Sequence, residues 1–271
     1  MEINRTNIME IVNNAGLKPD KDYGQNFLIE PDVCKRIVDS ALLCENDSIL
    51  EIGPGLGSLT HFISQTEAKI TIVDIDRRMI DFLLIFYRDK SNFSVIENDI
   101  RKTDVSSYSK IIGNLPYNIT TETVVYLLKN AVKAQRMVLM IQTEAFNRFH
   151  DLKGKDYGPA SILIHLLGNS KRLFNVKAGC FYPVPKCGST VFEITIDESK
   201  DRDLAIGVYE LSKQLFLNRR KTIMNNLHNY LHDKEKAEKV CLNCNILPNK
   251  RPEELSPEDF KNIYLELTLV K

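Results

Sequence analysis

The stretch Ser48–Gly57, SILEIGPGLG, places three glycines at alternate positions directly after a short apolar run. Such a run is typical of a buried strand, and the residues that follow, Leu59–Ser64, have the periodicity of a helix. Glycine lets the backbone turn sharply where a ligand can approach it without meeting a Cβ atom. A glycine-rich turn between a strand and a helix predicts a pocket for a nucleotide-type ligand.

The rest of the first two thirds of the chain continues this alternation of short apolar runs and amphipathic stretches. The pattern predicts a parallel sheet whose strands are joined by crossover helices. Strands are predicted at Ile49–Ile52, Lys69–Asp74, Phe93–Glu97, Lys110–Gly113 and Met137–Ile141, and helices at Leu59–Ser64, Arg77–Phe86 and Glu122–Lys129. Arg172–Val176 and Thr190–Ile196 alternate apolar with polar residues, which predicts an antiparallel pair at the edge of the sheet.

The last quarter of the chain has a different character. Asp197–Asp203 is polar throughout and predicts a connector. Beyond it the period is helical, and helices are predicted at Leu204–Leu217, Arg219–Tyr230, Lys234–Leu242 and Pro257–Leu265. We therefore predict an α/β domain over residues 1–199, with an N-terminal helical extension, and a small all-helical C-terminal domain over residues 200–271.

Composition narrows the class of protein. Of 271 residues, 43% are hydrophobic and 27% are charged, as in soluble globular chains, and no window approaches the roughly 18 apolar residues of a membrane helix. Without a signal peptide, the predicted location is the cytoplasm, and the six cysteines are expected to be reduced. The lone C-x-x-C at Cys241 and Cys244 does not predict a metal site. Because 36 basic residues balance 36 acidic ones, a nucleic-acid partner would need a local basic face.

The spacing of the glycines departs from the dinucleotide pattern G-x-G-x-x-G, since the sixth position from Gly53 is Ser58. It resembles instead the E-x-G-x-G-x-G loop of class I methyltransferases, which passes beside the methionine part of S-adenosylmethionine. Asp74, at the end of the second strand, is placed to accept hydrogen bonds from the ribose hydroxyls, with Asp76 as a rival. Asp99, after the third strand, can accept from the exocyclic amine of the cofactor's adenine.

Asn114-Leu115-Pro116-Tyr117 follows the fourth strand and resembles the [DNS]-P-P-[YF] tetrad of amino-group methyltransferases. The exocyclic nitrogen of adenine is a poor nucleophile because its lone pair is delocalised into the ring. The Asn114 side-chain oxygen and the Leu115 carbonyl, accepting from its two N–H bonds, would favour a pyramidal nitrogen, and Pro116 would hold the backbone there. Tyr117 would stack on a flipped-out base. The alternative is an ordinary proline turn that caps a helix.

Three further segments make a resemblance specific: Tyr23–Leu28 (YGQNFL), Phe181–Lys186 (FYPVPK) and Asn218–Ile223 (NRRKTI). They resemble signatures of the ribosomal-RNA adenine dimethyltransferases, and the resemblance covers almost the whole chain. The Arg-Arg-Lys stretch and Arg251–Ser256 (RPEELS) favour the branch that dimethylates two adjacent adenines near the 3′ end of small-subunit RNA. The resemblance therefore implies a Rossmann-like class I methyltransferase sheet and an enzyme that uses S-adenosylmethionine.

The resemblance also implies roles for individual residues. Asn26 and Leu28 would line the carboxylate side of the cofactor, and Asn114 would contact both the cofactor and the target amine. The remaining implied roles are methionine contact for Gly53 and Gly55, base stacking opposite Tyr117 for Phe181, and phosphate contact for Arg219, Arg220 and Lys221. Taken alone, Phe181 would more often be a packed loop anchor, and the three cations could equally be a solvated helix face. The implied partner is small-subunit ribosomal RNA in an immature 30S subunit, bound by a monomer with no metal and no membrane.

Some residues depart from the family's pattern. Asp74 stands where glutamate is usual, Thr143 replaces a common lysine, and Cys187-Gly188 replaces Val-Asp or Val-Asn. None of these changes removes a chemical group that methyl transfer needs, but several weaken the expected basic RNA face. Two alternatives therefore stand beside the small-subunit enzyme: a 23S ribosomal-RNA adenine methyltransferase that confers macrolide resistance, and a non-catalytic nucleic-acid-binding descendant.

Overall fold

A computed structural model describes residues 2–20, 25–116 and 118–269 and divides the chain into two compact units. The first unit contains residues 1–146 and 171–196, and the second contains residues 147–170 and 197–271. The predicted domain boundary after residue 199 lies close to the third crossing of the chain between units, after residue 196. The structure differs from that prediction over residues 147–170, which belong to the same unit as the C-terminal helices. Contacts between segments that are distant in the sequence decide this assignment, and no local pattern reveals them.

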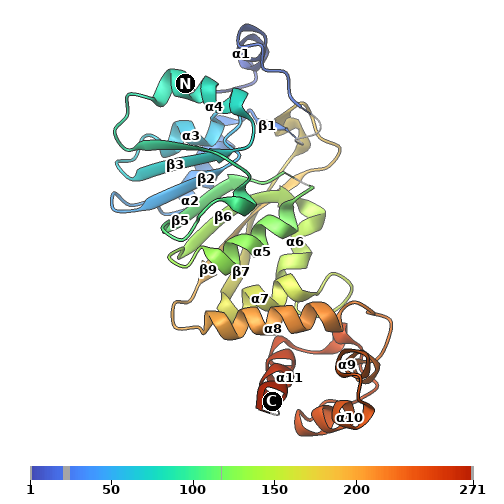
Figure 1. The fold of residues 1–271 in the computed structure, drawn as a ribbon. Helices are drawn as coiled ribbons and strands as arrows, with labels where there is room; N and C mark the ends of the chain where they lie inside the picture. The colour runs from blue at the N-terminus through green and yellow to red at the C-terminus, as the bar shows by residue number, and fades with distance from the viewer. Residues whose placement is uncertain (1, 21–24, 117, 270–271) are drawn as a thin grey trace. The chain divides into compact units, whose positions relative to one another are not determined.

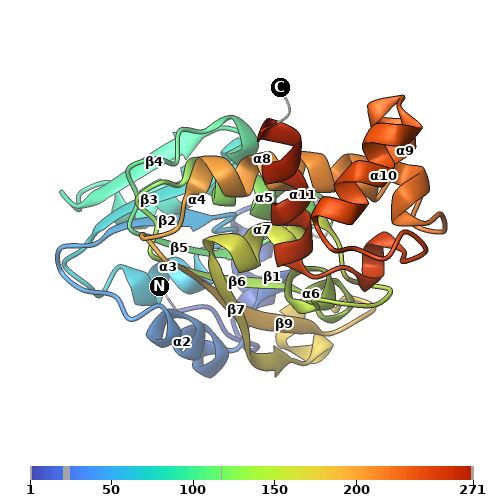
Figure 2. The ribbon, with the colours of Figure 1, turned by 90° about the horizontal axis from the view of Figure 1, so that it is seen from below.

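The first unit is built on a seven-stranded sheet with the order β4-β3-β2-β5-β6-β9-β7 (Figures 1 and 2). Its strands are β2 (Ser48–Ile52), β3 (Lys69–Asp74), β4 (Phe93–Glu97), β5 (Lys110–Asn114), β6 (Arg136–Gln142), β7 (Gly168–Val176) and β9 (Ser189–Ile196). The strands from β4 to β6 pair in parallel, and β9 pairs antiparallel with β6. The five predicted parallel strands are thus confirmed to within a residue at each end, and β9 and β7 are neighbours at the edge of the sheet, where the antiparallel pair was predicted.

One face of this sheet carries a continuous apolar core. Strand residues such as Ile49, Ile70 and Ile112 cluster with apolar residues of three helices, α2 (Pro31–Ser40), α3 (Ser58–Ile63) and α4 (Arg77–Tyr87). Proline occupies the first turn of α2, where its missing N–H costs nothing. The Asp76 side chain accepts from the backbone N–H of Arg78 and so caps α4. Helix α5 (Thr120–Asn130) connects β5 to β6.

The N-terminal segment forms part of the same unit. Helix α1 spans Ile8–Asn14, and the short strand β1 (Phe27–Leu28) pairs antiparallel with β8 (Phe181–Tyr182). This two-stranded pairing brings the Gln-Asn-Phe-Leu motif beside the Phe-x-Pro motif, although about 150 residues separate them in the sequence. Helix α6 (Thr143–His150) follows β6. Within the described part of the chain, no helix has the length and apolar character needed to cross a membrane.

The second unit is helical (Figure 2). It contains α7 (Pro159–Leu167), α8 (Arg202–Leu215), α9 (Ile223–Leu231), α10 (Lys234–Asn243) and α11 (Pro257–Leu269). The rings of Tyr157, Phe216 and Phe260 pack against one another in its core. The helix predicted from Arg219 to Tyr230 was wrong at its start. Thr222 has an extended backbone and its side chain accepts from the Asn225 N–H, so α9 begins at Ile223.

Candidate active site

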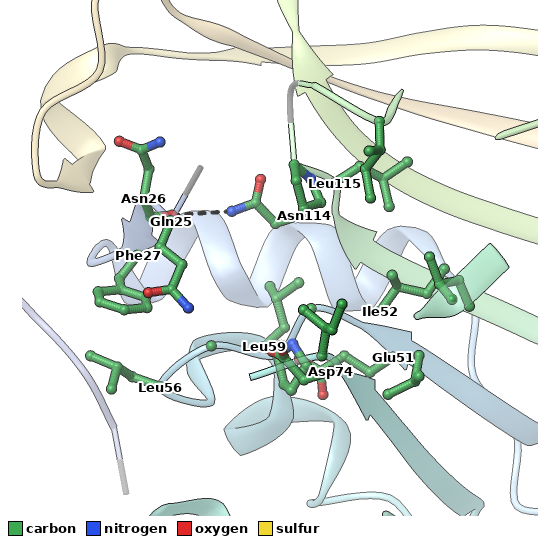
Figure 3. Close-up of a pocket in the computed structure, with 18 of the residues that line it drawn as sticks. Gln25, Asn26, Phe27, Glu51, Ile52, Leu56, Leu59, Asp74, Asn114 and Leu115 are labelled. Atoms are coloured by element: carbon green, nitrogen blue, oxygen red, sulfur yellow. Dashed lines mark hydrogen bonds between the residues drawn. The ribbon is translucent and has the colours of Figure 1, made fainter. Parts of the chain in front are cut away.

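A cavity of about 250 Å³ lies at the carboxyl ends of β2, β3 and β5, where an open α/β sheet binds its ligands (Figure 3). Of the predicted cofactor and catalytic residues, those that line it are Asn26, Leu28, Gly53, Gly55, Asp74, Asp99, Asn114, Leu115 and Pro116. The structure thus brings together residues from five separate segments of the chain. Tyr117 lies outside the described residues. No cluster of three or more His, Cys, Asp and Glu side chains suited to a metal ion occurs among the residues the structure describes.

The glycine loop needs its glycines. Gly53, Gly55 and Gly57 have φ angles of +63°, +54° and +91°, a region that residues with a Cβ atom rarely adopt. A Cβ atom on Gly57 would lie 2.5 Å from Cδ2 of Leu83, and one on Gly55 would lie 3.0 Å from the Phe27 ring. The loop therefore runs close to its neighbours and presents backbone to the cavity, as the spacing of the glycines predicted.

Glu51 precedes the loop and is almost completely buried, with 1% of its surface exposed. Its Oε2 atom accepts a hydrogen bond of 2.7 Å from the Thr60 hydroxyl, whereas Oε1 is buried without a hydrogen-bond partner in the described part of the chain. Burial raises the pKa of the Glu51 carboxyl to about 8. Glu51 is also among the residues that line the cavity.

Glu51 should make the stability of the protein depend on pH. In an unfolded chain a glutamate titrates near pH 4.3, so folding takes up a proton between about pH 5 and 8, and the free energy of unfolding falls as pH rises through that window. Glu51→Gln removes this titration. The free energy of unfolding is measured from denaturation curves at pH 5.5 and at pH 8. Between these two pH values we expect it to fall by about 3 kcal/mol less in Glu51→Gln than in the wild type. Equal falls in both proteins would contradict the assignment.

Asp74 and Asp76 were both candidates for the contact with the ribose hydroxyls, and their surroundings in the structure differ. Asp74 lines the cavity, and its Oδ1 accepts from the Asp76 backbone N–H at 2.9 Å. Burial raises the pKa of Asp74 to about 6. The Asp76 carboxylate is not part of the cavity lining and is instead occupied by Arg78 and Gln25. The geometry therefore favours Asp74 as the ribose contact, which stays a prediction.

Asp99 has a partner that the sequence analysis missed. Arg101 also lines the cavity, and its guanidinium donates to both Asp99 carboxylate oxygens, with Nη2 2.6 Å from Oδ2 and Nε 3.0 Å from Oδ1. The hydrogen bond from Arg101 holds the pKa of Asp99 below its usual value. A carboxylate has about four lone-pair sites, so a further donor such as an adenine amine can still be accepted. The position of Arg101, two residues after a strand-end acid, was the available signal in the sequence.

Asn114 ends β5 at the cavity, and its amide is held in one orientation. Nδ2 donates to the backbone carbonyl of Asn26 at 3.2 Å, so the amide group points toward the N-terminal segment (Figure 3). Oδ1 is then left as the acceptor. Leu115 is anchored by its backbone N–H, which donates to the Met140 carbonyl at 3.0 Å, and its side chain is buried. The role of Asn114 Oδ1 and the Leu115 carbonyl as an acceptor pair for an amine stays a prediction.

Phe181 does not reach the cavity. Its ring is 1% exposed and packs in the apolar core of the first unit, because β8 pairs with β1 and turns it inward. It is not among the residues that line the cavity. The structure thus matches the loop-anchor interpretation of Phe181 alone, and its stacking role stays a prediction.

The three predicted RNA-contacting cations lie in the turn before α9 and differ from one another. Nη2 of Arg219 donates to the Tyr157 carbonyl at 2.9 Å and contacts the Glu253 carboxylate at 3.2 Å, which ties this turn to two other loops of its unit. Arg220 and Lys221 are exposed. Phosphate contact stays a prediction for all three residues, and the exposed pair is better placed for it than Arg219.

Known proteins resemble this chain over most of its length. The family model for ribosomal RNA adenine dimethylase matches residues 16–269. Ribosomal RNA small subunit methyltransferase A of Malacoplasma penetrans is 37% identical over 253 residues, which cover 91% of this chain and 90% of that protein. A dimethyladenosine transferase from Plasmodium falciparum has a similar structure, with a TM-score of 0.77 and 25% identity, over 90% of this chain and 98% of that chain. The 23S rRNA methyltransferase ErmE shares the fold, with a TM-score of 0.68 and 20% identity, over 90% of this chain and 100% of that chain.

Proposed function

This chain belongs to the ribosomal RNA adenine dimethylase family, and we propose that it transfers methyl groups from S-adenosylmethionine to the N6 amines of two adjacent adenines near the 3′ end of small-subunit ribosomal RNA. The observation that carries the proposal is the position of Asn114 at the same cavity as the glycine loop. The substrate is proposed from the 37% identity to a small-subunit enzyme and from the Arg-Arg-Lys stretch. The enzyme would act as a monomer on an immature subunit.

The residues of the cavity fit S-adenosylmethionine. Gly53 and Gly55 present backbone with no Cβ atom, which suits the close approach of the methionine part. Glu51 Oε1 is a buried oxygen without a partner among the described residues, which a bound ammonium group would satisfy. Asp74 supplies acceptors for ribose hydroxyls, and Asp99 retains capacity for an adenine amine.

When bound, the cofactor supplies an electrophilic methyl group on a sulfonium, whose departure leaves a neutral thioether. The protein therefore needs no strong general base, and its main task is to align the target amine. Asn114 Oδ1 and the Leu115 carbonyl would accept hydrogen bonds from the two N–H groups of the unmethylated amine, or from the one that remains after the first transfer, and direct the lone pair toward the methyl group; the proton that the nitrogen loses in each transfer leaves to water. The hydrogen bond from Asn114 Nδ2 to the Asn26 carbonyl supports this role, because it prevents the amide from rotating.

Arg220 provides a test of the RNA face. We expect Arg220→Glu to weaken binding of small-subunit RNA about tenfold and to make the dependence of the binding constant on salt shallower, because a phosphate contact is lost. Binding isotherms at several salt concentrations measure both effects. Lys234→Glu in α10 makes the same change in charge and is the matched control. Equal weakening by both variants would show a non-specific effect of charge.

The activity itself is tested by incubating the protein with unmethylated small subunits and cofactor labelled in its methyl group. Label in N6,N6-dimethyladenine of the small-subunit RNA is the expected result, read by digestion and mass spectrometry. Label in large-subunit RNA would favour the resistance methylase instead. Cofactor binding without any label in RNA would favour the non-catalytic descendant.

A further inference from the structure

A partly buried hydrogen-bond network joins the N-terminal segment to the start of α4. Asp76 is charged but only 4% exposed, and burial of a carboxylate is costly unless it is paired. Arg78 provides the pairing, with Nη2 2.6 Å from Oδ2 and Nε 2.9 Å from Oδ1. The second partner comes from far away in the sequence: Gln25 Nε2 donates to Asp76 Oδ2 at 2.8 Å.

Both ends of the Gln25 amide are engaged. Its Nε2 donates to Asp76, and its Oε1 accepts from the backbone N–H of Asp20 at 2.9 Å. This arrangement determines which way the amide faces. Gln25 also lines the cavity, as do the three residues that follow it, and we call Gln25–Leu28 the N-terminal wall.

The N-terminal wall is held at its two ends by different residues. At Leu28, the carbonyl accepts a buried hydrogen bond of 2.6 Å from the hydroxyl of Ser58, the first residue of α3. At the other end, the Gln25 side chain donates its hydrogen bond to Asp76. Between these ends lies the Asn26 carbonyl, which accepts from Asn114. A displaced wall would therefore release Asn114 as well as the contacts of the wall itself.

We propose that Asp76 is a positioning residue that holds the N-terminal wall against the cofactor cavity through Gln25. The inference rests on the proposed function, because it assigns the cavity to S-adenosylmethionine. Capping of α4 alone does not explain the arrangement. The cap uses Oδ1, which accepts from the Arg78 backbone N–H at 3.0 Å, whereas Gln25 donates to Oδ2. The two roles of the side chain can therefore be separated by substitution.

The substitution Asp76→Asn tests the contact with Gln25 while it keeps an oxygen for the cap of α4. With its oxygen in the capping position, the amide presents an NH₂ group both to the NH₂ group of Gln25 and to Nη2 of Arg78, so donors face each other and the negative charge that pairs with Arg78 is lost. We expect the dissociation constant for S-adenosylhomocysteine to rise about tenfold, measured by calorimetry. The double variant Gln25→Glu with Asp76→Asn places a carboxylate oxygen opposite the new NH₂ group, and its other oxygen can still accept from Asp20. Most of the affinity should return in the double variant.

Asp81→Asn is the matched control. Asp81 lies in the same helix, is exposed, and accepts from Nε of Arg77 at 2.8 Å, but it has no part in the N-terminal wall. This variant should bind S-adenosylhomocysteine like the wild type. Hydrogen exchange provides a second readout: the backbone amides of Gln25 and Ile29, which donate to the carbonyls of Asp20 and Cys180, should exchange faster in Asp76→Asn and recover in the double variant.

Wild-type affinity and unchanged exchange in Asp76→Asn would overturn the inference. So would a double variant as weak as the single one, since the loss would then arise from the ion pair between Asp76 and Arg78 and not from Gln25. If the wild-type protein does not bind S-adenosylhomocysteine at all, the proposed function fails, and the exchange measurement still decides whether Asp76 holds the wall.

Discussion

Replacement of Asn114 with alanine is expected to lower the rate of methyl transfer by about 10³-fold, the size of effect seen when one preorganised hydrogen-bonding group is lost from an active site. The reason is that Oδ1 is the side-chain acceptor left for the target amine once Nδ2 is bonded to Asn26. The dissociation constant for S-adenosylhomocysteine should change by less than about threefold, because other residues carry the cofactor contacts. Single-turnover rates and calorimetry measure the two quantities separately.

Asn130→Ala is a suitable control for this variant. Asn130 is exposed at the end of α5, and its side chain bonds only to the Tyr126 carbonyl of the same helix among the described residues. This variant should transfer methyl groups at the wild-type rate. An equal loss of cofactor affinity and of turnover in Asn114→Ala would show that Asn114 has a structural role and would remove the main support for the proposed chemistry.

Asp74→Ala is expected to raise the dissociation constant for S-adenosylhomocysteine about 100-fold, because hydrogen bonds to a charged group contribute roughly 1.5–3 kcal/mol each. The pKa of Asp74 is raised to about 6, so its carboxylate is charged above that pH and protonated below it. The wild-type affinity should therefore fall as the pH drops from 7 to 5. In Asp74→Ala this part of the pH dependence should disappear.

Calorimetric titrations at pH 5 and 7 with both proteins test this expectation. Arg101 keeps Asp99 ionised over the same range, since it lowers the pKa of that group, so Asp99 should not contribute to the change. If the affinity of Asp74→Ala falls with pH as steeply as that of the wild type, another group is responsible, and the assignment of Asp74 to the ribose is wrong.

Most of the sheet could be predicted because the signals for its strands lie in neighbouring residues of the sequence. Strands such as Lys69–Asp74 and Phe93–Glu97 are short apolar runs with turn residues at both ends, and their observed bounds are those predicted. The glycine spacing of Gly53, Gly55 and Gly57 likewise depends on neighbours along the chain, since each φ angle is a property of one residue. The cavity therefore appears where the loop was expected.

Where the sequence could not decide the arrangement, the deciding contact lay far away along the chain. Phe181 is buried because β8 pairs with β1, and its sequence motif does not show which side of that pairing the ring takes. Arg219 was predicted in a helix with two other cations, but it lies in a turn and contacts Glu253. Residues 147–170 join the second unit because α7 packs against α8. The periodicity of apolar residues shows which face of a helix is buried, but it does not show which other element packs against that face.

The sequence by itself determined the parallel sheet, the glycine loop and the family. The reason is that the periodicity of apolar residues and the spacing of motif residues depend only on residues that are close together in the sequence. The tertiary structure alone decided which of two neighbouring acids faces the cavity. Asp74 and Asp76 are two residues apart at the same strand end, and no local pattern distinguishes them. Gln25 and Arg78 engage Asp76 and leave Asp74 to the cavity, and Gln25 is fifty-one residues away along the chain.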